Sequence, residues 1–557
     1  MTELLTTHAM GTDLERLDGR AKVTGTAPYA FEHPVDNPTY LHPVQSTIAR
    51  GRITAVDTSA AEAVPGVLTV LTHLNAPRLA DTSDAEYAVL QSDEVSFRGQ
   101  FIGAVIAETA ESARHAASLV HVSYDEAPHD VKLSADRDDL YSPEQVNAGF
   151  PTDSDAGDLD AALAAASITL DQTYTTPTEH NNPMEPHTTV AIWNDDGLTL
   201  YDSTQGVHAV RKAMATVFGL EPERVRVAAP YVGGGFGSKG LAHAHVVLAG
   251  LAAQVTDGRP VKLALTRQQM FVMVGYRTPT IQRVRYGAEA DGTLTAIGMD
   301  VVVQSAKLKE FVEQAAVPAR MMYAAPNRRT SHRAAALDVA IPSWMRAPGE
   351  CPGMFGPEVA MDELAIACGL DPIELRVRNE PENDPETGNP WSVRRLVDCL
   401  QEGARRFGWA DRDPEPGPAG RRVAARHRRG QLHLPVERDA RLGRRDRVRA
   451  RAVRGAHRCG GHRHRHVDRA EPDRCRRPGL PGRVDPAGDR GYRPADGDGG
   501  RRLRGYHLVG LGGRRRRPCV SGRARRRACR GHPGTGRDAG EPGHREVRAA
   551  LLRGAVR

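Results

Sequence analysis

The last quarter of the chain has a composition from which globular domains are not built. Residues 421–557 hold 40 Arg against 13 Asp or Glu, a net charge of +27, and contain no Ile, Met, Phe, Asn, Lys or Trp. Most of the apolar side chains that fill a protein core are therefore missing. Residues 1–420 have the opposite balance, with 35 Lys or Arg against 56 Asp or Glu. We expect residues 421–557 to lack a core and to be disordered.

Two interpretations account for this segment. Dense Arg attracts phosphate, so the segment fits a disordered arm that binds nucleic acid. However, Ile, Met, Asn, Lys and Phe all have codons that begin with two A/T bases, and a basic arm ordinarily includes Lys. Their joint absence is typical of a GC-rich gene read in the wrong frame. We favour this second interpretation and keep, as the alternative function, a basic nucleic-acid-binding protein that acts through its Arg-rich tail.

A one-base slip of the implied codons tests this interpretation. The slip fixes the first and third letters of each new codon and leaves only the middle letter free. Residues 423–442 then permit WLLGTGVASSTYPSNATPGS, and residues 544–556 permit TGKYALHSFGAQF. Residues 459–478 and 504–513 behave alike with the same slip direction, and all four windows have the alternation and Gly turns of ordinary protein. We therefore interpret 421–557 as an out-of-frame translation and exclude it from the fold argument.

The remaining sequence has no membrane or export signal. No window holds the roughly 18 consecutive apolar residues of a membrane helix. The start, MTELLTTHAMGTDLERLDGR, lacks the basic n-region and apolar h-region of a secretory signal. Seven scattered cysteines argue against a disulfide scaffold and fit a reducing compartment. We expect a cytoplasmic protein without a membrane partner, and leave export together with a partner subunit open.

Mixed helix and strand patterns predict an α+β fold with two domains. The first domain, residues 19–135, has strand patterns at 67–73, 101–108 and 119–126 and a helix at 112–117. A polar, Asp-rich stretch at 152–160 predicts a linker. The second domain, residues 150–415, is expected to contain strands at 167–176, 225–230 and 261–267, a hairpin with an Asp-Gly turn at 191–204, and helices at 208–219, 241–255 and 361–369.

Three features are candidates for chemistry. Gly233, Gly234 and Gly235, followed by Phe236 and Gly237, let the backbone approach a ligand and turn its N–H groups toward an anion or oxo group. Taken alone, a tight turn before a helix is the simpler interpretation.

The two other features are single side chains. Gln205, after a strand, has an amide that can donate to a buried ligand, although a polar strand end explains it as well. Arg346 lies in a loop shaped by Pro and Gly, where it either holds an anion rigidly or satisfies loop carbonyls.

A group of acids and histidines in TEHNNPMEPH is similar to a metal cluster. It comprises Glu179, His180, Glu185 and His187. The prolines in this stretch break any helix, so the HExxH geometry of zinc enzymes is absent. We predict no metal ion bound by side chains.

Five motifs occur in a single order along the chain: DGRAKVTG, EHNNPMEPH, DSTQG, GGGFGSKG and MRAPGECPGMFGPEVAMDELA. Together they resemble the molybdenum-binding catalytic subunit of the xanthine dehydrogenase/aldehyde oxidase family, of the bacterial three-subunit aldehyde oxidase type. The resemblance runs from about Gly11 to about Trp409. The slipped windows ADIGTGTW, AGTTWSASVG and YALHSFGAQF resemble the next family motifs in order. The resemblance implies a hammerhead-like N-terminal domain followed by the first half of a molybdopterin-binding domain.

The resemblance also implies a cofactor and the residues around it. The cofactor is a molybdopterin, in its cytosine dinucleotide form, with one molybdenum held by the cofactor itself. Gln205 matches the family Gln that hydrogen-bonds an apical oxo group, and Arg346 matches the Arg beside metal and substrate. Phe236 and Gly237 match positions that line the metal, and Gly234 and Gly235 belong to the same cofactor-binding turn.

The implied reaction is the oxidation of aldehydes to carboxylic acids with oxygen from water. Electrons leave through iron–sulfur centres on one partner subunit to FAD on another. Gly240 stands where purine-hydroxylating members carry an acidic residue, which favours aldehydes. The family base is a Glu in a GVGE-like motif near the C-terminus. No such motif occurs in this sequence, so we assign no catalytic residue and expect the chain to be inactive as translated.

Overall fold

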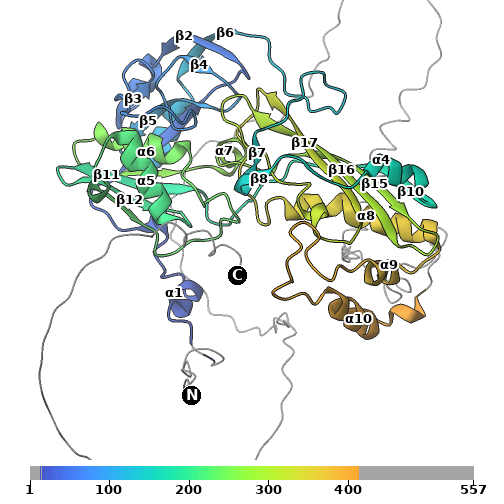
Figure 1. The fold of residues 1–557 in the computed structure, drawn as a ribbon. Helices are drawn as coiled ribbons and strands as arrows, with labels where there is room; N and C mark the ends of the chain where they lie inside the picture. The colour runs from blue at the N-terminus through green and yellow to red at the C-terminus, as the bar shows by residue number, and fades with distance from the viewer. Residues whose placement is uncertain (1–12, 14, 413–557) are drawn as a thin grey trace, which may run out of the picture. The chain divides into compact units, whose positions relative to one another are not determined.

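The computed structural model describes residue 13 and residues 15–412 (Figure 1). Strands and helices alternate along this part of the chain, and the predicted α+β fold is confirmed. No helix within it is both long and apolar enough to cross a membrane. The segment expected to lack a core, 421–557, lies outside the described residues.

A seven-stranded sheet joins strands from both predicted domains. In order across the sheet these are β13 (Val225–Ala228), β12 (Gly197–Asp202), β11 (Thr188–Asn194), β14 (Val261–Ala264), β1 (Thr39–Gln45), β5 (Phe101–Ala107) and β3 (Val67–Thr72). The join is made by β1, which pairs in parallel with β14 and antiparallel with β5. Strands from before residue 135 and after residue 150 therefore share one sheet. The domain boundaries given above stay a prediction.

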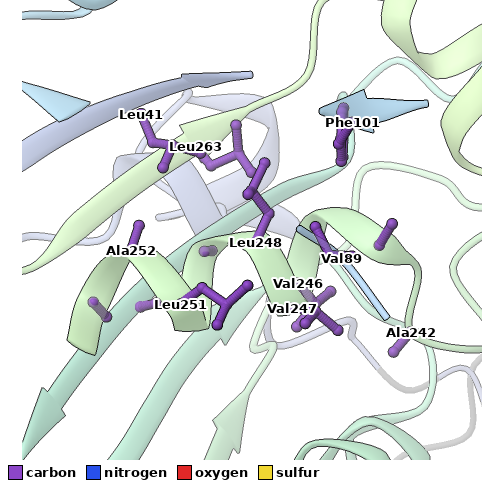
Figure 2. Close-up of a cluster of buried hydrophobic side chains, with 14 of the residues drawn as sticks. Leu41, Val89, Phe101, Ala242, Val246, Val247, Leu248, Leu251, Ala252 and Leu263 are labelled. Atoms are coloured by element: carbon purple, nitrogen blue, oxygen red, sulfur yellow. The ribbon is translucent and has the colours of Figure 1, made fainter. Parts of the chain in front are cut away.

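Helix α6 (Ala244–Gln254) lies in the core beside this sheet. Its residues from Ala244 to Ala253 are all buried, as expected of a helix that is apolar on every side. Figure 2 shows Leu248 of α6 in one cluster with Leu41 of β1 and Leu263 of β14. Helix α5 (Val207–Phe218) packs closely on α6, because the Phe218 ring occupies the space where Gly250 would carry a Cβ, 2.5 Å away. This packing fixes the chain segments that enter α5 and α6.

A five-stranded sheet forms the other large layer. Its order is β10 (Ile168–Thr176), β15 (Thr280–Ala288), β16 (Leu294–Ala306), β17 (Asn327–Leu337) and β9 (Ser154–Ala156). Helix α8 (Glu350–Cys368) lies against β10 and β15 (Figure 1). The loop between β17 and α8 carries Arg346.

Smaller elements complete the described part. A three-stranded sheet has the order β4 (Glu94–Val95), β2 (Gly51–Asp57) and β6 (His121–Glu126), and β7 (Gln145–Val146) pairs with β8 (Phe150–Pro151). The other α-helices are α1 (Gly19–Val23), α2 (Ser59–Glu62), α3 (Ala110–Ala117), α4 (Leu159–Ala165), α7 (Arg267–Met273), α9 (Pro372–Arg378) and α10 (Leu396–Phe407).

The linker predicted at 152–160 is wrong. Strand β9 in this stretch pairs with β17, and α4 begins at Leu159. The acidic residues that suggested a linker form ion pairs with arginines of β17: Asp153 with Arg333 at 2.8 Å, and Asp160 with Arg329 at 2.9 Å.

Two further predictions need correction. The helix predicted at 361–369 begins eleven residues earlier, at Glu350. In the hairpin, Asn194 pairs with Gly197, so Asp195 and Asp196 make the turn. Gly197 is needed instead for a close approach, since a Cβ there would lie 2.0 Å from the Arg224 carbonyl oxygen.

Candidate functional site

The sheet topology brings two of the predicted segments to one edge. Strands β12 and β13 are parallel neighbours, joined through α5. Gln205 follows β12, and the Gly233–Gly237 turn follows β13. Because the carboxyl ends of parallel strands lie at the same edge of a sheet, the two segments meet there, a usual place for ligands in such sheets.

Gln205 packs directly on the Gly-rich turn. Its backbone N–H donates to the Lys239 carbonyl at 2.8 Å, and its Oε1 lies 3.4 Å from the Gly237 amide nitrogen. A Cβ at Gly235 would lie only 2.3 Å from that Oε1. Glycine at 235 therefore makes room for the Gln205 amide.

A buried ion pair lies beneath the turn. The Lys239 side chain is fully buried, and its Nζ donates to the Glu185 carboxylate at 2.9 Å and to the Glu185 carbonyl at 3.0 Å. The same carboxylate accepts from the Gly233 amide at 2.7 Å. Burial lowers the pKa of Lys239, and the hydrogen bond that Lys239 donates to Glu185 opposes this effect. This pair fixes where the turn begins.

The Arg346 loop closes over the turn from the other sheet. The Arg346 N–H donates to the Phe236 carbonyl at 2.8 Å. Asn181 Nδ2 donates to the carbonyl oxygens of Phe236 and Trp344, at 2.7 and 3.1 Å. Gly237 has a φ of +106°, and a Cβ there would lie 2.6 Å from the Trp344 carbonyl oxygen. The structure thus brings Gln205, Phe236, Gly237 and Arg346 together, although they are far apart in the sequence.

Two non-glycine residues at this contact have left-handed backbone conformations. Phe236 has a φ of 55° and Ala347 a φ of 57°. Such residues cost about 1–3 kcal/mol each and persist where the surroundings fix them, often at ligand sites. Here the fixed backbone presents the side chains of Gln205, Phe236 and Arg346, all exposed. Within the described part of the chain, neither the Gln205 amide nitrogen nor the Arg346 guanidinium has a hydrogen-bond partner.

The acids and histidines of TEHNNPMEPH have separate positions. Within residues 15–412 no group of three or more His, Cys, Asp or Glu is arranged to hold a metal ion. Glu185 binds Lys239 as above, and Glu179 pairs with Arg277 at 3.1 Å. His180 contacts the Phe271 ring edge. His187 is buried with its Nε2 3.2 Å from the Ser238 carbonyl oxygen, and burial places its pKa well below the usual value.

The residues that hold the turn and the Arg346 loop in place could not be identified from the sequence. Lys239 was visible in the motif GGGFGSKG, but its partner Glu185 lies 54 residues away. Asn181 lies within a motif considered for metal binding, and Arg277 in no motif at all. A buried Lys, Arg or Asn has no signal in a single sequence, because only the fold shows which carbonyls it meets.

Comparison with known proteins agrees with this architecture. Residues 24–128 match the family described as the aldehyde oxidase and xanthine dehydrogenase a/b hammerhead domain, and residues 141–380 match the molybdopterin cofactor-binding domain.

Individual proteins match over the same part of the chain. The aldehyde oxidoreductase molybdenum-binding subunit PaoC of Escherichia coli O157:H7 is 38% identical over 412 residues, covering 73% of this chain and 55% of that protein. A putative xanthine dehydrogenase molybdenum-binding subunit of Escherichia coli K12 is 28% identical, covering 72% and 56%. Among solved structures, the aldehyde oxidoreductase from Desulfovibrio gigas superposes with a TM-score of 0.62 at 29% identity, covering 71% of this chain and 46% of that one.

The chain thus spans about half the length of the relatives it matches. The matches run across both the hammerhead and the cofactor-binding parts, and five sequence motifs occur in the family's order. The chain belongs to the aldehyde oxidase and xanthine dehydrogenase family, with that family's hammerhead domain followed by its molybdopterin cofactor-binding domain.

Proposed function

We propose that this chain is built as the catalytic subunit of a molybdenum hydroxylase that oxidises aldehydes to carboxylic acids, with oxygen taken from water. The observation that carries the proposal is the contact between the Gly233–Gly237 turn, Gln205 and the Arg346 loop. These segments come from two different sheets, and a shared ligand is a reason for them to present polar groups at one place.

The residues present fit a molybdopterin with molybdenum. Gly235 and Gly237 let the turn pack closely against Gln205 and the Trp344 carbonyl, which brings the polar groups of these segments to one place. Asn181 Oδ1 and Glu185 Oε1 are buried beside the turn without a hydrogen-bond partner among the described residues. Buried polar atoms of this kind are usually satisfied, so they favour a further group at the site.

Each exposed side chain has a role in this proposal. The Gln205 amide nitrogen donates a hydrogen bond to an oxo group, and the Arg346 guanidinium orients an anionic group. The Phe236 ring, 45% exposed, provides an apolar wall that excludes water. When bound, the cofactor supplies the oxygen transfer and accepts the electrons. The protein supplies position and electrostatics.

The position of Gly240 supports an aldehyde over a purine substrate. A Cβ at this residue would lie 3.1 Å from the Trp344 ring. An acidic side chain there would require Trp344 to move, and Trp344 is held by a 2.8 Å hydrogen bond from its Nε1 to Asn147.

Further parts of the proposal concern the cofactor form, the partners and the tail. We propose the cytosine dinucleotide form of the cofactor, and electron transfer through an iron–sulfur subunit to a FAD subunit. The matched relatives described as molybdenum-binding subunits support such an assembly. We also propose that residues 421–557 are out of frame and that the chain is inactive as translated. The Arg-rich composition supports this, because it offers too little apolar surface to enclose a cofactor.

The test compares this chain with a version whose frame is restored near codon 422. Each is expressed with its partner subunits, and molybdenum content and benzaldehyde oxidation are measured. We expect metal and turnover in the restored protein, and neither in the original. Equal loading and turnover would contradict the frame interpretation, and a restored protein without molybdenum would contradict the proposed function.

A further inference from the structure

A buried arginine outside the predicted site donates hydrogen bonds to the backbone of the Arg346 loop. Arg277 lies just before β15 and is 2% exposed. Its Nη2 lies 3.1, 2.5 and 3.1 Å from the carbonyl oxygens of Met345, Arg346 and Ala347. Since Nη2 carries two hydrogens, at least one is shared between carbonyls. Three successive peptide groups are therefore held by one nitrogen.

Glu313 connects Arg277 to the end of the loop by two further hydrogen bonds. Its Oε1 accepts from Arg277 Nε at 3.2 Å and from the Gly349 amide at 2.8 Å. Gly349 has a φ of +83° and directly precedes α8. The ion pair between Arg277 and Glu313 thus binds the loop through carbonyls on one side and an N–H on the other. Glu313 is fully buried.

The backbone and the side chain of Arg346 have different surroundings. The carbonyl of Arg346 points to the buried Arg277, while its own guanidinium is exposed and meets no partner within residues 15–412. The carboxylates of Glu179 and Glu313 pair with Arg277 and balance its buried charge. The charge of Arg346 is therefore not neutralised by the loop and is available to a ligand.

We propose that Arg277 is a positioning residue, which holds the 344–349 loop so that the guanidinium of Arg346 faces the bound group. The inference rests on the proposed function in one respect, since it assigns Arg346 to that group. Arg277 itself does not touch ligand, because its donors are committed to Glu179, Glu313 and the three loop carbonyls.

The test measures hydrogen exchange by mass spectrometry on the full-length chain. The peptide covering 344–350 contains the amides of Arg346 and Gly349, both hydrogen-bonded in the structure. Hydrogen bonds to a charged group are among the stronger ones in proteins, so Arg277→Met should speed exchange in this peptide about tenfold or more. Arg277→Lys keeps the charge beside Glu313 but cannot reach all three carbonyls, and should give an intermediate rate.

Two variants control for general loss of structure. Arg283→Met removes an arginine of β15 whose partner, Asp171, is on the surface, and should leave the loop rate unchanged. Arg277→Met with Glu313→Gln removes both buried charges, so that no carboxylate is left unpaired if the single variant does not fold. It should free the loop in the same way.

A wild-type exchange rate at 344–350 in both Arg277→Met variants would overturn the inference. Equal acceleration in β16 and in the loop would also overturn it, because that indicates a general stabilising role. The measurement needs no cofactor. Its result is therefore independent of the molybdenum measurement that decides the proposed function.

Discussion

Alanine at two glycines of the same turn should lower stability to very different extents. At Gly237 the backbone φ of +106° disfavours any side chain, which costs about 1–3 kcal/mol. The Cβ would also overlap the Trp344 carbonyl oxygen at 2.6 Å. That oxygen belongs to a loop fixed by Asn181 and Arg277, so it cannot move away cheaply, and forced overlap costs about 1–3 kcal/mol more. We expect Gly237→Ala to lower the free energy of unfolding by about 2–6 kcal/mol in total.

At Gly235 the nearest atom is the end of an exposed side chain. A Cβ would lie 2.3 Å from Gln205 Oε1, whose amide can swing into solvent, and 3.0 Å from the Lys239 Cβ, which needs to shift by only a few tenths of an ångström. We expect Gly235→Ala to change stability by less than about 1 kcal/mol. The amide must move by about 1 Å, however, and a displacement of that size can cost about 10²-fold in rate at a reaction site. Gly235→Ala should therefore impair the site while leaving the fold intact.

Urea unfolding followed by tryptophan fluorescence measures the difference, because Trp344 lies at the contact. Gly403→Ala, in α10 with nothing within 4 Å of the new Cβ, controls for the change from Gly to Ala and should be neutral or slightly stabilising. Equal stability losses at Gly235 and Gly237 would contradict this prediction, since they would mean that the Arg346 loop is not rigidly packed on the turn.

Substitutions at three buried charged sites test the electrostatics by urea unfolding. Lys239→Met should cost about 3–5 kcal/mol because Glu185 is left buried and unpaired, and adding Glu185→Gln should recover part of the loss. Burial raises the pKa of Asp202 to about 6, so the folded state binds the proton more tightly than the unfolded state. The free energy of unfolding should therefore fall by up to about 3 kcal/mol as the pH rises from about 4 to about 6. Asp202→Asn keeps an acceptor for the Thr189 hydroxyl and should remove this pH dependence. Burial raises the pKa of Glu86, but His243 and Lys309 outweigh it and lower the pKa to about 2. The ionised Glu86 carboxylate should stabilise the fold above about pH 4.5, and this stabilisation should be lost as the pH falls toward 2. Glu86→Gln should abolish this loss at low pH and should lower the free energy of unfolding near pH 7.

Elements with a strong local pattern could be predicted from the sequence. The short runs of β-branched and apolar residues in VLTVLTH and FIGAVIAE predicted β3 and β5, and the run of apolar residues after Leu241 predicted α6. The first half of α8 could not be predicted in this way, because Gly353, Gly356 and Pro357 are poor helix residues. Tertiary contacts override that preference. Gln282 accepts from the Gly356 amide and donates to the Pro352 carbonyl, and Gly353 allows the helix to lie against the Ala315 carbonyl.

The candidate site was predictable where a family motif carried it. Gln205, the Gly-rich turn and Arg346 each lie in a motif, and their order along the chain indicated a common ligand. The groups that hold them in place were not predictable. Arg277 acts on carbonyls 68 to 70 residues further along the chain, and no local pattern connects such positions. The acids at 153 and 160 were misread for the same reason, because their arginine partners lie on a distant strand.

In the proposed function, Gln205 and Arg346, presented by the turn and the loop, would hold a molybdenum cofactor. The direct test is the molybdenum content per chain of the frame-restored protein, purified with its partner subunits, compared with a Gln205→Ala, Arg346→Ala double variant. We expect close to one molybdenum in the restored protein and several-fold less in the double variant, with the fold unchanged because both side chains are exposed. Equal molybdenum in the two proteins, or none in the restored protein, would contradict it.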